Sequence, residues 1–91
     1  MPFVYILRCS DDTLYAGWTV DLKQRLTAHN EGRGARYTRG RRPARLAYWE
    51  HQPNRSAALQ RESAIRRLSR AAKLSLIAGH RAGPLPGEDS Q

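Results

Sequence analysis

The chain has a single cysteine, Cys9, so it can form no internal disulfide and no zinc site built from cysteines. Long hydrophobic runs are missing as well, because no stretch approaches the roughly 20 apolar residues that span a bilayer. The amino terminus lacks a basic segment followed by a long apolar one, which is the pattern of a secretory signal. These absences predict a cytoplasmic protein with no membrane partner, in which Cys9 is a reduced thiol.

Acidic residues are few compared with basic ones. Eight Asp and Glu stand against 16 Lys and Arg, which gives a formal net charge of +8. Such an excess predicts a polyanionic partner and says little about the fold. Nucleic acid fits this charge better than an anionic membrane surface does; we expect DNA and leave RNA open. The 91 residues suffice for one domain with a modest core.

Two aromatic and β-branched runs, residues 3–7 and 14–18, predict a β-hairpin near the amino terminus. The Ser and Asp residues between them favour a turn, since their side chains bond to their own backbone. Each strand carries one tyrosine, Tyr5 and Tyr15. If the chain folds back through residues 10–12, the two positions come roughly opposite each other, within cross-strand reach.

Residues 22–31 predict a helix of about three turns. Leu22 and Leu26, four apart, form its buried stripe. Arg25 and His29, also four apart, line up along a neighbouring face. One helix therefore projects a guanidinium and an imidazole in the same direction.

The segment from 32 to 45 contains six arginines, three glycines and no acid. Such a run cannot bury itself, so we expect a surface loop that a partner orders. It is the expected nucleic-acid contact, through Arg33, Arg36, Tyr37, Arg39, Arg41 and Arg42.

Residues 46–51 follow as an aromatic third strand, so the economical arrangement is a three-stranded antiparallel sheet. Two more helices are predicted, over 57–68 and 70–78. The expected residues at the amino-terminal caps of the three helices are Asp21 or Thr19, Asn54 or Ser56, and Ser69. The fold class is therefore α/β of the α+β type, a small sheet flanked by about three helices. We expect a domain over 1–79 and a disordered Pro/Gly-rich tail over 80–91.

Glu62 has an unusual predicted position on the 57–68 helix. At 100° per residue it falls in the centre of the apolar stripe of Ala58, Leu59 and Ile65. An acid on a buried face is costly unless it is paired, hydrogen-bonded or bound to a metal. On the last helix, the residues predicted to pack inward are Ala71, Leu74 and Ile77.

Five residues from separate elements suggest phosphodiester hydrolysis: Tyr5, Tyr15, Arg25, His29 and Glu62. That reaction needs a polarised water, a cation beside the phosphate and usually a metal held by a carboxylate. Glu62 would hold one Mg²⁺, or Mn²⁺, that keeps several of its waters. Arg25 would bind the scissile phosphate, because its planar fork matches phosphate oxygens. No small-molecule cofactor is expected.

These residues resemble the GIY-YIG nucleases, in particular their small stand-alone bacterial branch. The likeness covers about residues 3–78. Its main matches are residues 3–5 and 15–17 for the two signatures, Arg25 and His29 in the first helix, and Glu62 in the second. Phe3, Val4 and Ala16 depart from the signatures at packing positions.

The resemblance implies a compact fold with a three-stranded antiparallel sheet, and hydrolysis of DNA strands with a single metal. The tyrosine matching Tyr5 would take the proton of the attacking water as a phenolate, and the one matching Tyr15 would bond near the phosphate. Glu62 would carry the metal. Since free tyrosine titrates near 10, a phenolate needs a cation such as Arg25 or hydrated Mg²⁺ beside it. His29 has the more suitable intrinsic pKa and is the alternative proton acceptor.

We therefore predict a metal-dependent endonuclease with little base specificity, acting at structured, nicked or single-stranded DNA sites, with DNA repair as its family-level role. The rival is a non-catalytic nucleic-acid-binding module with the same fold. Individual residues also have simpler explanations. His29 would then only interact with a helix dipole, and Glu62 would pair with Arg66 one turn on.

Overall fold

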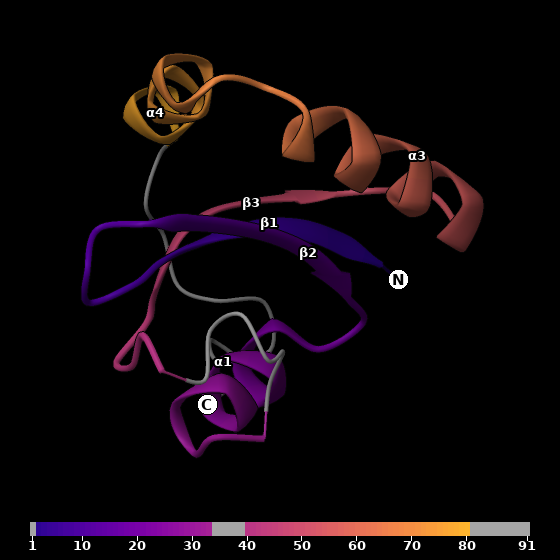
Figure 1. Ribbon diagram of the computed structural model, residues 1–91. Helices are drawn as coiled ribbons and strands as arrows, with labels where there is room; N and C mark the ends of the chain where they lie inside the picture. Colours follow the sequence, from indigo (N-terminus) through magenta and orange to yellow (C-terminus); the bar gives the residue numbers. More distant parts are fainter. Residues whose placement is uncertain (1, 34–39, 81–91) are drawn as a thin grey trace.

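The computed structural model describes residues 2–33 and 40–80, which form a three-stranded antiparallel sheet with helices on both faces (Figure 1). Helix α1 lies against one face, and α3 and α4 lie over the other. The strand order is β2-β1-β3. The elements are β1 Phe3–Arg8, β2 Leu14–Thr19, α1 Leu22–Asn30, β3 Arg45–His51, α3 Arg55–Arg66 and α4 Arg70–Gly79. The predicted fold class is confirmed.

The central strand β1 is buried on both faces, which explains its unbroken apolar run. Val4 and Ile6 pack toward α3 and α4 in a cluster with Ala58 and Ile65. The alternate residues of β1, Tyr5 and Leu7, belong to a second cluster with Leu22 of α1. The sheet therefore separates two small cores.

The hairpin register differs from the prediction. Tyr5 is paired with Gly17, and Tyr15 is paired with Leu7. The two tyrosines are thus diagonal neighbours on the same face, within reach of aromatic side chains. A backbone hydrogen bond from the Cys9 amide to the Thr13 carbonyl oxygen puts the centre of the turn at Asp11, within the predicted turn of residues 10–12. A turn centred there pairs position 5 with position 17, so the tyrosines are not directly opposite.

The capping residues are those predicted, and the structure selects one of each pair of alternatives. Asp21 accepts a hydrogen bond from the Gln24 amide, Asn54 from Ala57, and Ser69 from Ala72. Because Asn54 is the cap, α3 begins at Arg55, two residues before the predicted start, and ends at Arg66.

Two residues predicted to pack inward are exposed, Leu59 on α3 and Ala71 on α4. Helix α3 meets the sheet along the line from Ala58 to Ile65, which leaves the Leu59 side chain 43% exposed on its flank. Ala71 lies in the first turn of α4, whereas Leu76 and Ile77, nearer its end, pack against the core.

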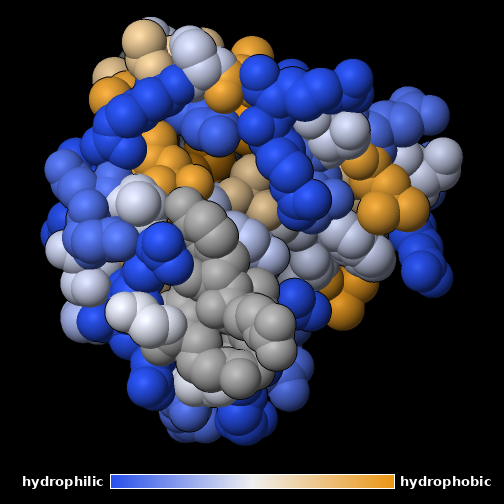
Figure 2. Space-filling model, in the orientation of Figure 1, coloured by the Kyte–Doolittle hydropathy of each residue, from blue (hydrophilic) through white to orange (hydrophobic). Residues whose placement is uncertain are grey.

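The predicted tail, residues 80–91, lies outside the described residues except for His80. In the ranges 2–33 and 40–80, no helix has the length and apolarity needed to cross a membrane. Figure 2 shows hydrophilic side chains over most of one face of the molecule, with smaller hydrophobic patches between them. This surface matches the excess of basic residues in the sequence.

Candidate active site

Tyr5 is almost completely enclosed in the candidate site. Its side chain is 1% exposed and lies over Gly17, its partner on β2. A Cβ atom built on Gly17 would come within 2.5 Å of the Tyr5 hydroxyl oxygen and 2.7 Å of Cζ. Gly17 therefore provides the space that the phenol ring occupies.

Replacing Gly17 with alanine is expected to destabilise the protein by about 1–3 kcal/mol, because the Tyr5 ring is buried and has to move. The free energy of unfolding can be measured by urea denaturation. Gly79→Ala is the matched control, since a Cβ there meets nothing within 4 Å. Equal stability of the two variants would contradict the close fit between Gly17 and Tyr5.

His29 lies between the two tyrosines. Its ring is 1% exposed, and its Nε2 atom is 3.4 Å from the Tyr5 hydroxyl. The ring centroids are 6.4 Å apart for Tyr5 and His29 and 5.7 Å apart for Tyr15 and His29, in edge-on arrangements. Helix α1 therefore inserts an imidazole between the two phenols, and His29 is part of the buried interior.

The protonation states in this cluster are set mainly by burial. Burial raises the pKa of Tyr5 to about 12, against the lowering effect of the Arg25 charge, while Tyr15 and Glu62 add to the increase. Burial lowers the pKa of His29 below its ordinary value of 6.5, and the positive charge of Arg25 lowers it further. At neutral pH the phenol is protonated and the imidazole is neutral, so Tyr5 can donate to His29.

Arg25 projects from α1 on the exposed side of this cluster. Its positive charge lowers the pKa of both Tyr5 and His29, which places the guanidinium near both side chains. It also borders a depression of about 300 Å³ that includes Gln24 and Arg33. Arg25 is therefore near the buried hydroxyl and still accessible to a ligand.

Glu62 reaches the site from the opposite layer of the fold. Its side chain is only 17% exposed, which agrees with the predicted inward position. Its carboxylate accepts a hydrogen bond of 2.9 Å from Nη2 of Arg66, whose side chain is 58% exposed. Arg66 Nη2 also lies 3.4 Å from the Ala16 carbonyl oxygen on β2. This contact places the pair beside the edge strand.

The five predicted residues are thus arranged in two groups. Tyr5, Tyr15 and His29 are in contact, and Arg25 stands beside them. Glu62 comes from α3, on the other face of the sheet, and influences Tyr5 electrostatically. The edge of β2 is the boundary between the two groups, so a substrate that meets both has to lie along this edge.

A network that sequence reasoning missed ties α3 to β3. Glu50 accepts a 2.8 Å hydrogen bond from Nε of Arg61 and a 2.5 Å bond from Nε2 of Gln52, and the Tyr48 hydroxyl donates to the same carboxylate. Arg61 directly precedes Glu62. The network therefore joins the middle of α3 to β3, and no spacing in the sequence indicates it.

The carboxylate of Glu62 suits a hard cation that keeps most of its waters. Among the residues that the structure describes, no three His, Cys, Asp or Glu side chains come together as a metal site. A site that draws most of its ligands from protein side chains, as structural zinc does, is therefore not formed in this part. Mg²⁺ or Mn²⁺, held by one carboxylate and water, is compatible with it.

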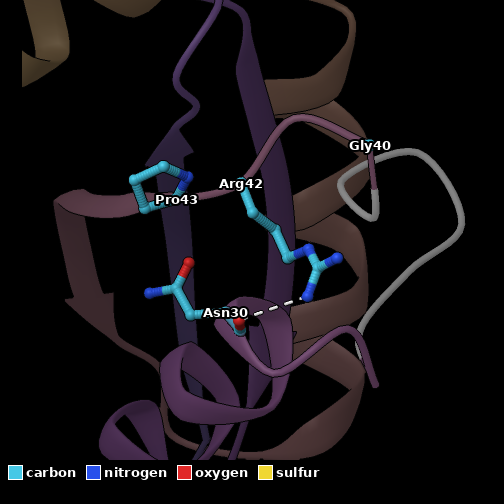
Figure 3. A pocket seen from close by; sticks show the side chains of 4 residues that line it. All are labelled: Asn30, Gly40, Arg42 and Pro43. Atoms are coloured by element: carbon cyan, nitrogen blue, oxygen red, sulfur yellow. Dashed lines mark hydrogen bonds between the residues drawn. The ribbon is translucent and has the colours of Figure 1, made fainter.

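The described parts of the basic segment pack back on the protein. Arg41 approaches Asp11 to 3.0 Å, and Arg33 pairs with Glu31. The Arg42 guanidinium lies 3.5 Å from the carbonyl oxygen of Asn30, beside a pocket of about 410 Å³ (Figure 3). Three predicted nucleic-acid contacts lie outside the described residues: Arg36, Tyr37 and Arg39.

Asn30 is a second residue that sequence reasoning missed. Its amide donates to the Ala44 carbonyl oxygen at 3.0 Å and accepts from the Ala44 amide at 2.7 Å. Asn30 fastens the end of the basic segment to α1, one residue after His29.

Comparison with known proteins agrees with this fold. A family model described as the GIY-YIG catalytic domain matches residues 1–75. The chain is 52% identical over 77 residues to UPF0213 protein CPE1444 of Clostridium perfringens, covering 85% of this chain and 83% of that protein. It is 53% identical over 76 residues to a UPF0213 protein of Syntrophus aciditrophicus, covering 82% and 87%. The solution structure of UPF0213 protein BH0048 from Bacillus halodurans is similar, with a TM-score of 0.55, 40% identity, and coverage of 86% and 84%.

Proposed function

The chain belongs to the GIY-YIG catalytic domain family, and from this membership we propose that it is a divalent-metal-dependent endonuclease that hydrolyses DNA phosphodiester bonds. The observation that carries the proposal is the buried contact between Tyr5 and His29, with Arg25 beside it and Glu62 across the edge of β2. A protein that only binds nucleic acid has no need of a phenol and an imidazole so enclosed.

In the proposed reaction, His29 is the final proton acceptor. Its lowered pKa keeps the imidazole neutral at physiological pH, so Nε2 can accept the Tyr5 proton. The Tyr5 oxygen in turn takes a proton from the attacking water. A resting Tyr5 phenolate is disfavoured, because burial raises its pKa to about 12. The sequence left open which group accepts the proton, and the proposed relay combines two of the candidates, Tyr5 and His29.

Arg25 and Glu62 are proposed to act on the phosphate and the metal. The Arg25 guanidinium has the planar shape for two phosphate oxygens, and it is accessible on α1. The Glu62 carboxylate would hold the divalent cation, which supplies positive charge for the phosphate oxygens as the bond breaks. The Tyr15 hydroxyl is proposed to bond beside the phosphate.

The excess of basic residues supports DNA as the substrate and offers no means of reading bases. Arg41 and Arg42 would contact phosphates in this proposal, and phosphate contacts position a nucleic acid without specifying its sequence. We therefore propose low sequence specificity and structured, nicked or single-stranded sites. A role in DNA repair and a cytoplasmic location stay predictions.

The proposal is tested by incubating the purified protein with labelled single-stranded, duplex and branched DNA, and with matching RNA. Each substrate is offered with Mg²⁺, with Mn²⁺ and with EDTA, and products are resolved on denaturing gels. We expect cleavage of at least one DNA substrate with metal and none with EDTA. Binding without cleavage with every divalent metal would contradict the proposed nuclease activity and favour a non-catalytic nucleic-acid-binding module.

A further inference from the structure

Two shallow depressions adjoin along the outer edge of β2, and neither is lined by residues of the 32–45 segment. The first has a volume of about 350 Å³, and the second, of about 180 Å³, shares Leu14 and Lys73 with it. Tyr15, Ala16 and Arg66 complete the first, and Thr13 and Arg70 complete the second. Together they form a continuous strip, the β2-edge groove, which begins at Tyr15 in the candidate active site and ends at the hairpin turn.

The walls of the β2-edge groove are basic. Residues 55–73 contain six Lys and Arg and a single acid, Glu62. Three of these cations, Arg66, Lys73 and Arg70, are spaced along the groove. In the described ranges, Lys73 forms no ion pair with an acid. The groove therefore holds more positive charge than the neighbouring carboxylates neutralise.

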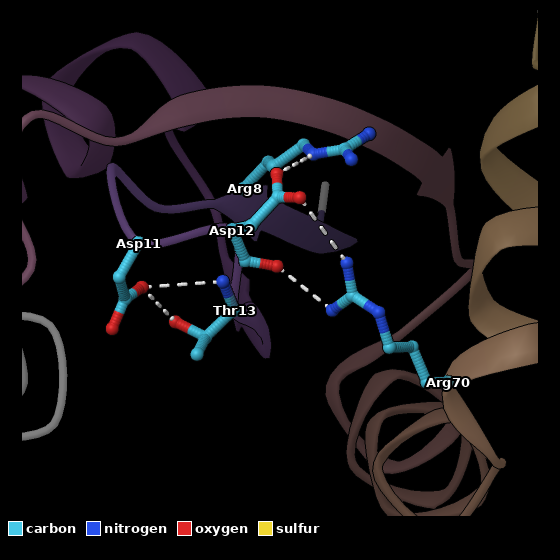
Figure 4. Close-up of polar contacts among 5 residues, drawn as sticks. All are labelled: Arg8, Asp11, Asp12, Thr13 and Arg70. Atoms are coloured by element: carbon cyan, nitrogen blue, oxygen red, sulfur yellow. Dashed lines mark hydrogen bonds and ion pairs between the residues drawn. The ribbon is translucent and has the colours of Figure 1, made fainter.

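Arg70 is held in place at the far end of the groove. Its Nη1 donates to the Asp12 carbonyl oxygen at 2.7 Å, and its Nη2 lies 3.6 Å from the Asp12 carboxylate (Figure 4). Arg8 contacts the same carboxylate at 2.7 Å. These contacts join the start of α4 to the hairpin turn. The shape of this end of the groove therefore does not depend on a bound ligand.

We propose that the β2-edge groove binds a single-stranded segment of DNA adjacent to the bond that is cut. This inference rests on the proposed function, and it names where the strand lies beyond the reacting phosphate. Arg66, Lys73 and Arg70 follow one another along the two depressions, as the phosphates of one strand follow one another along its backbone. The depressions are small, so one strand fits them and a duplex does not.

Lys73 is the most informative residue to change. Its substitution breaks no ion pair in the described structure, and it does not touch the Tyr5–His29 contact. We compare Lys73→Gln with two control variants. Lys23→Gln removes the same charge from the exposed surface of α1. Arg67→Gln removes a positive charge next to Arg66 in the sequence, at a residue that does not line the groove. Lys73→Arg should restore binding, because it keeps the charge.

The Kd for fluorescently labelled single-stranded DNA is measured by anisotropy in EDTA, at several salt concentrations. One lost phosphate contact reduces the slope of log Kd against log salt by about 0.7 for a single strand, which corresponds to about fivefold weaker binding at 0.1 M salt. We expect this change for Lys73→Gln, and smaller changes for Lys23→Gln and Arg67→Gln. Circular dichroism establishes that each variant is folded.

Because the measurement needs no cleavage, its failure is separate from failure of the nuclease assay. Equal Kd values and salt slopes for Lys73→Gln and the two control variants would contradict strand binding in the β2-edge groove, even if the protein cuts DNA. An effect of Lys73→Gln on duplex DNA but not on single strands would overturn it as well. A loss of affinity restricted to Lys73→Gln supports strand binding in the groove even if no nuclease activity is found. Tighter binding of RNA than of DNA supports the same groove, with ribose instead of deoxyribose in the bound strand.

Discussion

Replacing Glu62 with glutamine should reduce metal-dependent DNA cleavage by about a thousandfold or more. The amide has nearly the shape of the carboxylate and can still accept a hydrogen bond from Arg66, but it carries no charge for a divalent cation. Losing the metal's charge beside the phosphate raises the barrier by several kcal/mol, and each 1.36 kcal/mol is about tenfold in rate. Single-turnover cleavage at saturating protein measures this loss directly.

Glu50→Gln is the matched control for Glu62→Gln, because it makes the same chemical change to another partly buried carboxylate, on β3. It is expected to reduce stability by weakening the bond to Arg61, with a much smaller effect on cleavage. Binding of DNA to the Glu62 variant in EDTA should be equal to or tighter than that of the unaltered protein. Full activity of Glu62→Gln would remove Glu62 from the reaction.

Replacing Tyr5 with phenylalanine should reduce cleavage by about 100- to 10,000-fold, the usual range for a group that moves a proton. The substitution removes only the hydroxyl that lies 3.4 Å from His29 Nε2 and leaves the ring over Gly17. Tyr48→Phe is the matched control, since that hydroxyl contacts Glu50 on the opposite face of the sheet. Rates are compared under single-turnover conditions for both variants.

The pH dependence separates a Tyr5–His29 relay from a free Tyr5 phenolate. Because the pKa of His29 is lowered, the imidazole loses its proton below pH 6.5, and the rate should rise with pH only up to that region and then level off. A phenolate with a pKa of about 12 would make the rate rise about tenfold per pH unit through pH 7–9. Such a continued rise would contradict the role given to His29.

The strands and helices can be predicted from the sequence because each is marked by residues that are close together in the chain. The apolar run of β1 is typical of a strand buried on both faces, and the capping residues Asp21, Asn54 and Ser69 mark where helices begin. The inward position of Glu62 follows from helical periodicity. The hairpin register was predicted less well, since it depends on which residue sits at the centre of the turn.

What the sequence does not predict depends on segments that meet only after folding. The bonds between Asn30 and Ala44, and between Glu50 and Arg61, join different parts of the chain, and no periodicity marks them. The exposure of Leu59 has the same origin, because it is set by the line along which α3 meets the sheet. The buried position of His29 was also missed, since a polar residue on a helix is ordinarily expected to face solvent.

The strand order β2-β1-β3 also determines which parts of the site can move. Tyr5 lies on the central strand, so a shift of its backbone requires the loss of pairing on both sides of β1, which amounts to unfolding the domain. Arg25 and Arg66, in contrast, extend from helix surfaces and can change rotamer without disturbing the sheet. The phenol proposed to transfer a proton is therefore carried by the central strand of the sheet, while the cations on the helix surfaces can adjust to a bound ligand.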